Sequence, residues 1–248
     1  KKESRCITVN NPNRLYLIEH FVVTNNTYSL LLEALNDVNN QYFFASLLRK
    51  EKEDSRKTGG MIDKSDAIFT QYGVYNKSQQ DMTWNFANGG KLKFDYYSDG
   101  FEDFKKRFQG LELSYIGVDE ITHMQYAYFK YLLTCNRNAH GLKNRFVGTC
   151  NPDPDSWVAE FIDWWIDEDG YPIPERNGVV RYFFMYGDTV NEIYWGDTKN
   201  EVYLQAQDRI DKLWKNIRKN VAGPVWLINT PKFISPLSKS NPDDERVV

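Results

Sequence analysis

A short apolar stretch that ends in two acids, LSYIGVDE at residues 113–120, constrains the fold more than any other part of the chain. Its apolar and β-branched residues predict a strand that is buried on both faces of a parallel sheet. Asp119 and Glu120 follow directly at the carboxyl end of that strand. Open α/β sheets bind ligands outside their strand ends, so acids at this place favour a chemical role. The alternative is a pair of solvated acids before a helix, whose dipole favours negative charge at its start.

The two acids would have distinct roles if the site handled a nucleoside triphosphate. The first carboxylate, Asp119, would then hold Mg²⁺ through water. The second carboxylate, Glu120, would orient and activate the attacking water. The acid pair alone does not choose between these roles and the solvated alternative.

The size and charge of the chain admit a broad class of protein. With 248 residues it can hold one large α/β domain, or one domain with an appendage. No apolar run approaches the roughly 20 residues that cross a bilayer, so we expect no membrane partner. Three cysteines and three histidines are scattered without metal-site spacing, which favours a reducing compartment and argues against zinc. The net charge of −3 does not indicate nucleic-acid binding, although a local basic face would suffice.

The first pattern along the chain resembles the frame of a phosphate-binding loop. Residues 15–23 predict a strand, TNNT follows at residues 24–27, and a leucine stripe then predicts a helix. Helix N-terminal amides attract anions, so phosphate would bind at such a turn. A Walker A loop requires glycine and lysine, however, and TNNT supplies neither. Thr27 alone can provide a hydroxyl ligand for magnesium, and it is equally well explained as the cap of the helix.

The rest of the chain alternates between strand and helix patterns. Strands are predicted at residues 42–48, 83–86, 91–97, 144–150, 179–186, 192–195 and 225–234. Helices are predicted at residues 61–73, 99–108, 122–137, 156–168 and 198–219, with Thr122 capping the third of these. Strands 83–86 and 91–97 form one predicted hairpin, and strands 179–186 and 192–195 form another. The charged run at residues 50–57 predicts a solvated helix or loop.

This order predicts an α/β fold with a three-layer, mainly parallel sheet and inserted β-hairpins. We expect one domain over residues 1–236, followed by a polar tail or linker at 237–248. A second polar strand end is predicted at Asn151, next to the acidic one. An amide there can sense a terminal phosphate, although an asparagine that closes a turn explains it equally well.

The chain resembles the large terminase subunits of tailed bacteriophages, which package DNA into capsids. The resemblance rests on five blocks in order: YSLLLEALNDVN, LLRKEKEDSRKTGGMIDKS, TWNFANGGKLKF, FQGLELSYIGVDEITHM and GTCNPDPDSWV. It covers residues 15–166 well and the remainder loosely. It implies a RecA-like fold of the P-loop NTPase type.

The resemblance implies roles for particular residues. Asp119 is similar to the Walker B aspartate and Glu120 to the catalytic glutamate. Thr149, Asn151 and Pro152 are similar to the motif that couples hydrolysis to movement.

The nucleotide-binding residues that the resemblance implies come from two further places. The turn and the start of the first helix supply four candidates: Asn25, Asn26, Thr27 and Tyr28. Arg49, at a strand end, would contact nucleotide or would brace the loop through a carboxylate, and both readings stay open. Arg107 is a candidate arginine finger that reaches a neighbouring subunit's nucleotide, whereas the default for such a residue is an exposed helical arginine.

Asn26 occupies the position where relatives carry a lysine, and an amide cannot neutralise a phosphate. Two explanations stay open: a catalytically weakened motor, or a mobile Gly-rich loop that is left out of the chain as presented. The DNA sequence that encodes residues 23–28 decides between them.

The function that the resemblance implies is ATP hydrolysis with Mg²⁺, which drives double-stranded DNA into a capsid. The implied partners are the portal protein, the small terminase subunit and further copies in a homo-oligomeric ring, in the host cell cytoplasm on the procapsid. Non-specific DNA contacts would come from Lys143, Arg145, Lys215 and Arg218. No nuclease activity is expected, because residues 237–248 offer only three clustered acids.

Two other functions compete with this one. A terminase-like module that binds DNA or the portal without hydrolysis is favoured by the altered loop. A carbohydrate-active protein is the third reading, from Trp164, Trp165, Trp195 and Trp226 beside acids. Core packing on an amphipathic helix explains at least one of these tryptophans instead.

Overall fold

The computed structural model describes residues 16–18, 22–24, 26–76, 78, 81–151 and 153–220. Contacts divide the chain into two compact units, with the boundary between Ile173 and Pro174. Each unit is described by itself below. The expected single domain over residues 1–236 stays a prediction.

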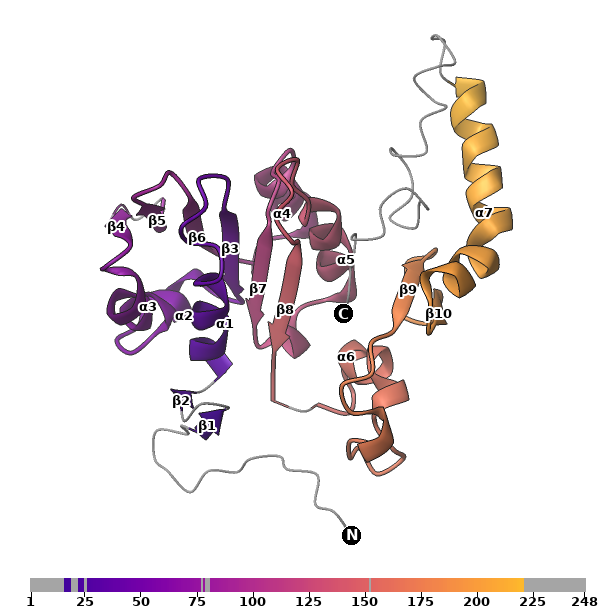
Figure 1. Ribbon diagram of the computed structural model, residues 1–248, viewed down its shortest axis with the longest axis horizontal. Helices are drawn as coiled ribbons and strands as arrows, with labels where there is room; N and C mark the ends of the chain where they lie inside the picture. The colour runs from indigo at the N-terminus through magenta and orange to yellow at the C-terminus, as the bar shows by residue number, and fades with distance from the viewer. Residues whose placement is uncertain are drawn as a thin grey trace. The chain divides into compact units, whose positions relative to one another are not determined.

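The first unit is built on a six-stranded mixed sheet (Figure 1). Its order is β4 (Gly73–Asn76), β5 (Thr83–Phe86), β6 (Lys91–Tyr96), β3 (Phe44–Arg49), β7 (Tyr115–Asp119) and β8 (Arg145–Thr149). Strands β6, β3, β7 and β8 run parallel to one another. Strands β4 and β5 extend the sheet antiparallel beyond β6. The predicted α/β class with a mainly parallel sheet and an inserted hairpin is therefore confirmed.

Strand β7 lies at the centre of the parallel part, and all five of its residues are buried as predicted. It pairs with β3 on one side and with β8 on the other, so its main chain is hydrogen-bonded along both edges. Gly117 is required at its middle, because an added Cβ would lie 2.4 Å from the Leu47 side chain. The apolar composition of the strand follows from this burial.

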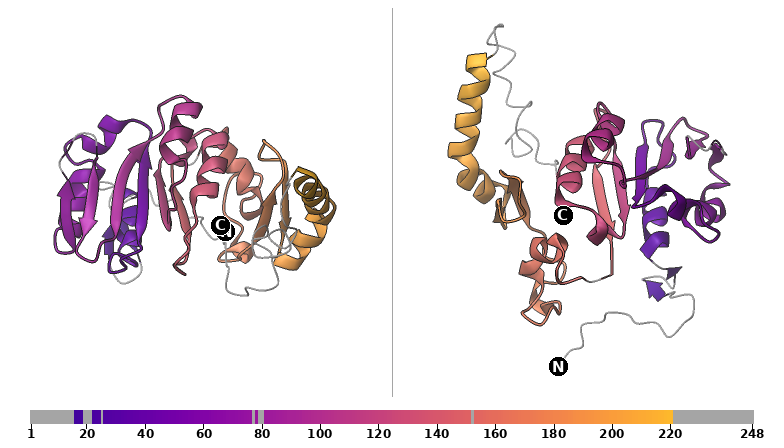
Figure 2. Two further views of the ribbon diagram at one scale, coloured as in Figure 1. Left: turned by 90° about the horizontal axis from the view of Figure 1, so that it is seen from above. Right: turned by 180° about the vertical axis from the view of Figure 1, so that it is seen from behind.

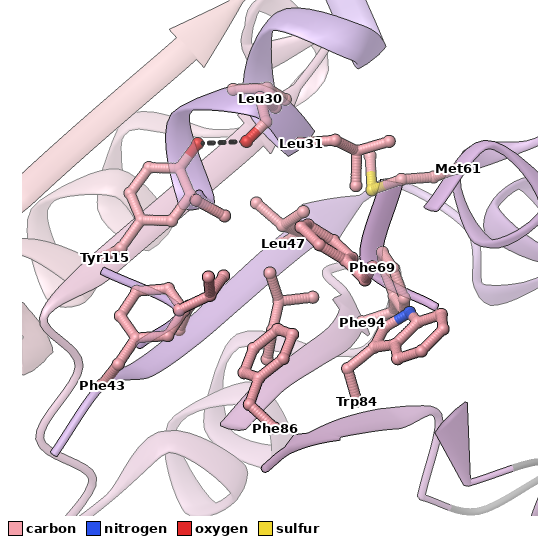
Figure 3. Close-up of a cluster of buried hydrophobic side chains, with 14 of the residues drawn as sticks. Leu30, Leu31, Phe43, Leu47, Met61, Phe69, Trp84, Phe86, Phe94 and Tyr115 are labelled. Carbon is pink, nitrogen blue, oxygen red and sulfur yellow. Dashed lines mark hydrogen bonds between the residues drawn. The ribbon is translucent and has the colours of Figure 1, made fainter. Parts of the chain in front are cut away.

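One face of the sheet is covered by α1 (Asn26–Ala34) and α3 (Met61–Phe69), whose buried residues join those of β3, β5 and β6 in one apolar cluster (Figure 3). The Tyr115 hydroxyl donates to the Leu30 carbonyl at 2.9 Å and ties β7 to α1. The helix α2 (Lys52–Arg56) lies between β3 and α3 in the chain and packs against both.

The opposite face carries α4 (Phe101–Phe108) and α5 (Tyr126–Cys135). On β8, Val147 packs against the α1 cluster, while the Phe146 ring lies 5.1 Å from the Phe129 ring of α5. Adjacent strand residues point to opposite faces, so these contacts place helices on both faces of the sheet. Figure 2 shows this three-layer arrangement from above and from behind.

The predicted strand at residues 15–23 is wrong as a strand of the main sheet. The structure has β1 (Tyr16–Ile18) and β2 (Val22–Thr24), which pair antiparallel with each other in a separate two-stranded sheet. Because β1 and β2 hydrogen-bond to each other, the backbone groups of both short segments are satisfied although neither segment pairs with β8. Strand β8 is accordingly an edge of the six-stranded sheet, and its residues are half-buried or exposed where burial was predicted.

Two helix predictions need correction. Thr122 does not cap α5: it lies in a 3₁₀ turn, η2 (Ile121–His123), and the N-cap position of α5 is held by Gln125, whose side chain makes no capping hydrogen bond. The expected helix at residues 156–168 is broken into α6 (Trp157–Phe161) and η3 (Asp163–Trp165). The Asp167 carboxylate accepts the backbone N–H groups of Asp169 and Tyr171, and this turn competes with the helix. The short, mostly half-buried strand β4 was not predicted.

The second unit contains η4 (Pro174–Arg176), a hairpin and a long helix, and the latter two agree with prediction. Strands β9 (Tyr182–Met185) and β10 (Ile193–Gly196) pair antiparallel, and α7 (Lys199–Asn220) packs on them. Val202, Ala206 and Ile210 form the buried stripe of α7 at helical spacing. The predicted strand at residues 225–234, Trp226 and the tail lie outside the described residues.

Candidate functional site

The candidate site lies where four parallel strands end. Because β6, β3, β7 and β8 run in the same direction, the residues at their carboxyl ends lie along one edge of the sheet. Arg49 ends β3, Asp119 ends β7 and Thr149 ends β8, while Tyr97 follows β6. The first turn of α1 adds Thr27 to this edge.

Asp119 is the most buried acid of the site, with 2% of its surface exposed. One carboxylate oxygen accepts a hydrogen bond from the Thr27 hydroxyl at 3.1 Å, and the other accepts one from the Thr149 hydroxyl at 3.0 Å. Arg49 Nε lies 3.6 Å from the oxygen that Thr27 contacts. A buried carboxylate needs such partners, because desolvation without them is costly. Asp119 therefore joins the ends of three elements.

Glu120 has a backbone conformation that is unusual for its residue type. Its φ of 57° and ψ of 52° are left-handed, and Met82 is the other described non-glycine residue with positive φ. The half-buried carboxylate lies between Arg49 Nη2 at 3.4 Å and His123 Nδ1 at 3.5 Å. The Glu120 carbonyl accepts a hydrogen bond from the Tyr97 hydroxyl at 3.2 Å. Both ends of Glu120 are thus held by neighbouring strands and by its own turn.

The electrostatics of the site extend to two residues that the sequence reasoning missed. Burial, with the nearby Glu120 and Asp119 carboxylates adding to it, raises the pKa of Tyr97 well above its ordinary value. Burial lowers the pKa of Lys64 on α3, Asp119 opposes that shift and Arg49 adds to it. The Lys64 ammonium lies 5.7 Å from the centre of the Tyr28 ring. Lys64 is therefore within electrostatic range of the acids and of Arg49.

Five residues that the sequence pointed to are brought into direct contact: Thr27, Arg49, Asp119, Glu120 and Thr149. Asn26 lies close by, and its amide donates to the Cys150 carbonyl at 3.5 Å. Asn151 follows β8 and is exposed. Asn25 and Pro152 lie outside the described residues.

Arg107 is not the exposed helical arginine that was the default expectation. Its side chain is 24% exposed, and its guanidinium contacts Asp95 at 2.7 Å, the Tyr96 carbonyl at 2.8 Å and Asp99 at 3.5 Å. It also lies 3.9 Å from the centre of the Tyr96 ring. The arginine-finger role stays a prediction, and it would require these contacts within the chain to break.

Arg145 is likewise engaged within the chain. Its guanidinium pairs with Glu33 at 2.8 Å and Asp37 at 2.7 Å, and 16% of the side chain is exposed. These pairs tie β8 to the end of α1, so the structure does not support the expected DNA contact. The side chains of Lys215 and Arg218 lie outside the described residues.

Tyr97 escaped prediction because residues 91–97 were interpreted as one half of a hairpin. In the structure β6 also pairs in parallel with β3, and this pairing brings its carboxyl end to the acidic edge. The signal in the sequence was the run DYYSD at residues 95–99, which brings polar and aromatic residues to the carboxyl end of β6. Asp119 and Glu120 end the pattern of β7 in the same way.

The oxygen atoms at this edge fit a magnesium ion that is also held by phosphate. Mg²⁺ prefers one or two protein oxygens together with waters and phosphate oxygens. The Thr27 hydroxyl gives its hydrogen to Asp119, which leaves its lone pairs for a metal. Among the described residues no group of three His, Cys, Asp or Glu side chains could hold a metal alone. Arg49 Nε is buried and makes no hydrogen bond to a described residue, so it suits an anionic acceptor.

The fold and the site together define an α/β protein with an acid pair, a hydroxyl and an arginine at the carboxyl edge of its parallel strands. The family model described as terminase large subunit, T4likevirus-type, N-terminal, matches residues 20–222. The chain belongs to this family, which confirms the resemblance read from the sequence. Phage DNA packaging by an ATPase motor is the biology of the family.

Solved structures give weaker likenesses. The large terminase of a thermophilic bacteriophage is 16% identical with a TM-score of 0.44, and the match covers 56% of this chain and 35% of that one. The same terminase in complex with ADP is 19% identical with a TM-score of 0.38, over 52% of this chain and 31% of that one. The N-terminal domain of the DNA packaging ATPase of bacteriophage phi29 is 12% identical with a TM-score of 0.43, over 66% and 81%.

This chain thus spans about a third of the length of that terminase. No match is found among curated proteins. Within the part of the chain that the structure describes, no helix has the length and apolar character to cross a bilayer.

Proposed function

We propose that this chain hydrolyses ATP with Mg²⁺ as the motor part of a phage DNA-packaging terminase. The observation that carries the proposal is the junction at Asp119, where a buried carboxylate meets the Thr27 hydroxyl, the Thr149 hydroxyl and Arg49. Such a junction places oxygen ligands, a cation and a second acid at one strand edge. These are the parts that phosphoryl transfer to water requires.

Thr27 and Asp119 are proposed to hold the metal, directly through the hydroxyl and through water from the carboxylate. When bound, Mg²⁺ would offset the charge of the phosphate oxygens. Thr149 fixes the rotation of the Asp119 carboxylate through its 3.0 Å hydrogen bond. The coupling motif therefore reaches the metal ligand through Thr149, and Asn151 is proposed to report the loss of the terminal phosphate.

Glu120 is proposed to orient the attacking water and to accept its proton. Its carboxylate is paired with Arg49 at 3.4 Å in the structure. Arg49 is proposed to exchange part of this contact for a phosphate oxygen when nucleotide binds, which frees one Glu120 oxygen for water. Both open readings of Arg49, nucleotide contact and brace, then describe two states of the same side chain.

Because asparagine and not lysine stands at position 26, other residues must supply the positive charge that faces the phosphates. Asn26 supplies an amide, which cannot neutralise phosphate. Arg49 and Lys64 are the cations that act electrostatically at this edge, together with any charge from outside the described residues. We propose that they share the role of the absent lysine.

The wider activity is proposed from family membership. ATP hydrolysis would move double-stranded DNA into a capsid, with the portal protein and the small terminase subunit as partners. Copies of the chain would act in a homo-oligomeric ring, in the host cell cytoplasm on the procapsid.

The direct test compares ATP hydrolysis by the chain and by its Glu120→Gln variant. The variant should lose about 10³-fold in kcat, because the proton acceptor is removed, while ATP still binds. Glu102→Gln on the exposed face of α4 is the matched control and should keep full activity, since the exposed Glu102 carboxylate pairs with Lys105 of the same helix. An active Glu120→Gln protein would refute the assignment.

A module that binds DNA or the portal without hydrolysis is the second candidate, and the Asn26 amide favours it. Equilibrium binding of a fluorescent ATP analogue separates the two. Tight, Mg²⁺-dependent binding that Asp119→Asn abolishes supports the ATPase, and no binding at millimolar analogue supports the module.

A further inference from the structure

The left-handed backbone conformation of Glu120 must be stabilised by neighbouring groups. A left-handed backbone is unfavourable for a residue with a Cβ and persists only where its surroundings enforce it. Glu120 adopts it at the point where β7 turns into η2. The direction of the Glu120 side chain depends on this backbone turn, so whatever holds the turn also aims the carboxylate.

Within the turn the Glu120 carbonyl accepts the backbone N–H of His123 at 3.0 Å, and from the end of another strand the Tyr97 hydroxyl reaches the same carbonyl. The hydroxyl donates to the Glu120 carbonyl at 3.2 Å. Tyr97 itself is 6% exposed, and its backbone N–H donates to the carbonyls of Arg49 and Lys50, both at 3.2 Å. Tyr97 therefore spans from the end of β3, where Arg49 lies, to the turn after β7.

This bridge connects the two groups that face each other in the site. The main chain of Tyr97 is fixed to the residue that pairs with the Glu120 carboxylate, and its hydroxyl is fixed to the Glu120 main chain. Tyr97 thus adds a second link between Arg49 and Glu120, beside the direct pairing of β3 with β7.

We propose that Tyr97 is a positioning residue for Glu120, whose hydroxyl holds the left-handed turn that aims the carboxylate at the attacking water. The proposal rests on the proposed function for the identity of the reaction. Tyr97 does not touch the substrate and acts through Glu120. Its raised pKa keeps the hydroxyl protonated, so it remains a donor at neutral pH.

The test is the Tyr97→Phe variant, which keeps the buried ring and removes only the hydroxyl. We expect kcat for ATP hydrolysis to fall about tenfold, the factor that corresponds to one ordinary hydrogen bond, with KM changed less than about twofold. Binding of a non-hydrolysable ATP analogue should stay unchanged.

The matched control is Tyr128→Phe. Tyr128 is 7% exposed, and its hydroxyl also donates to a backbone carbonyl, that of Asp99 at 2.8 Å. Both variants should lose a similar amount of thermal stability, and only Tyr97→Phe should lose kcat. Equal kcat for the two variants overturns the proposal.

A crystal structure of Tyr97→Phe gives a readout that does not require hydrolysis. We expect Glu120 to leave the left-handed region, or its carboxylate to lose the Arg49 contact. Unchanged Glu120 geometry overturns the positioning role, whatever the activity. A wild-type chain without ATPase activity, together with a displaced Glu120 in the variant, would refute the proposed function and leave the positioning of Glu120 by Tyr97 supported.

Discussion

Two arginine clusters lie at the ends of neighbouring strands, and they differ in how completely they are satisfied. Arg49 lies between Asp119 and Glu120, with contacts of 3.6 and 3.4 Å. Arg107 lies against Asp95 and the Tyr96 carbonyl at 2.7 and 2.8 Å, and it stacks on the Tyr96 ring. Asp119 and Asp95 are nearly equally buried.

The difference shows that residue types alone do not identify a site. The guanidinium of Arg107 is held by short hydrogen bonds and by an aromatic ring, as expected of a structural brace. The longer contacts of Arg49 leave it able to turn to another anion. We therefore assign binding and catalysis to the Arg49 cluster and stability to the Arg107 cluster.

The largest expected effect comes from Arg49→Gln. Without the guanidinium, the developing charge on the phosphate loses the proposed donor that lies between the two acids, and kcat/KM for ATP should fall by about 10³. Steady-state hydrolysis measures the loss. Arg56→Gln on α2, at an exposed arginine seven residues further along, is the control and should keep activity. Equal activity of the two variants would remove Arg49 from the site.

Arg107→Ala should act on stability instead. Among the described residues, the substitution leaves the buried Asp95 with Lys93, 3.4 Å away, as its ionic partner, and the free energy of unfolding should fall by about 3 kcal/mol. Chemical denaturation measures it, with Lys106→Ala on the exposed side of α4 as the control. A stable Arg107→Ala chain that stops hydrolysis in mixed assemblies with wild-type chains would establish the arginine finger.

The smallest expected effect concerns pH and Lys64. The pKa of Lys64 is lowered in the folded chain, first by burial, so the unfolded chain binds more protons below pH 10.5. Its contribution to stability should therefore rise with pH as pH climbs from the lowered value towards 10.5. The difference in melting temperature between wild type and Lys64→Met across alkaline pH should show this slope, because the titration of Tyr97 is common to both proteins.

If nucleotide binds at the proposed site, it should reduce the pH dependence of stability that Lys64 causes. A bound triphosphate favours the charged amine and so raises the pKa of Lys64, which would flatten the slope. A slope that ATP leaves unchanged places Lys64 away from the phosphates.

The fold was predictable where the pattern of apolar residues in the sequence indicates which residues are buried. The apolar run of β7 and the acids after it predicted both a buried strand and the edge at which the site lies. The leucine stripe of α1 and the pattern of α7 were equally direct. These features follow from burial, which sequence periodicity reports.

The remainder depends on pairing between distant segments. The parallel pairing of β6 with β3 brings Tyr97 to the site, and no local pattern specifies it. The left-handed Glu120 is likewise set by contacts across the chain. The pairing of β1 with β2 is local, and it was missed because residues 15–23 were interpreted as one continuous strand. Arg107 was misjudged because its partners Asp95 and Tyr96 lie on a different element, at the end of β6, and a loop separates them from α4.

The most direct test of the account is a crystal structure of the chain with Mg²⁺ and a non-hydrolysable ATP analogue. We expect a metal ion on the Thr27 hydroxyl with Asp119 in its hydration shell, and the terminal phosphate within hydrogen-bond distance of Arg49. Nucleotide bound at any other place, with the Asp119 junction and the Arg49 pairs unchanged, would contradict it.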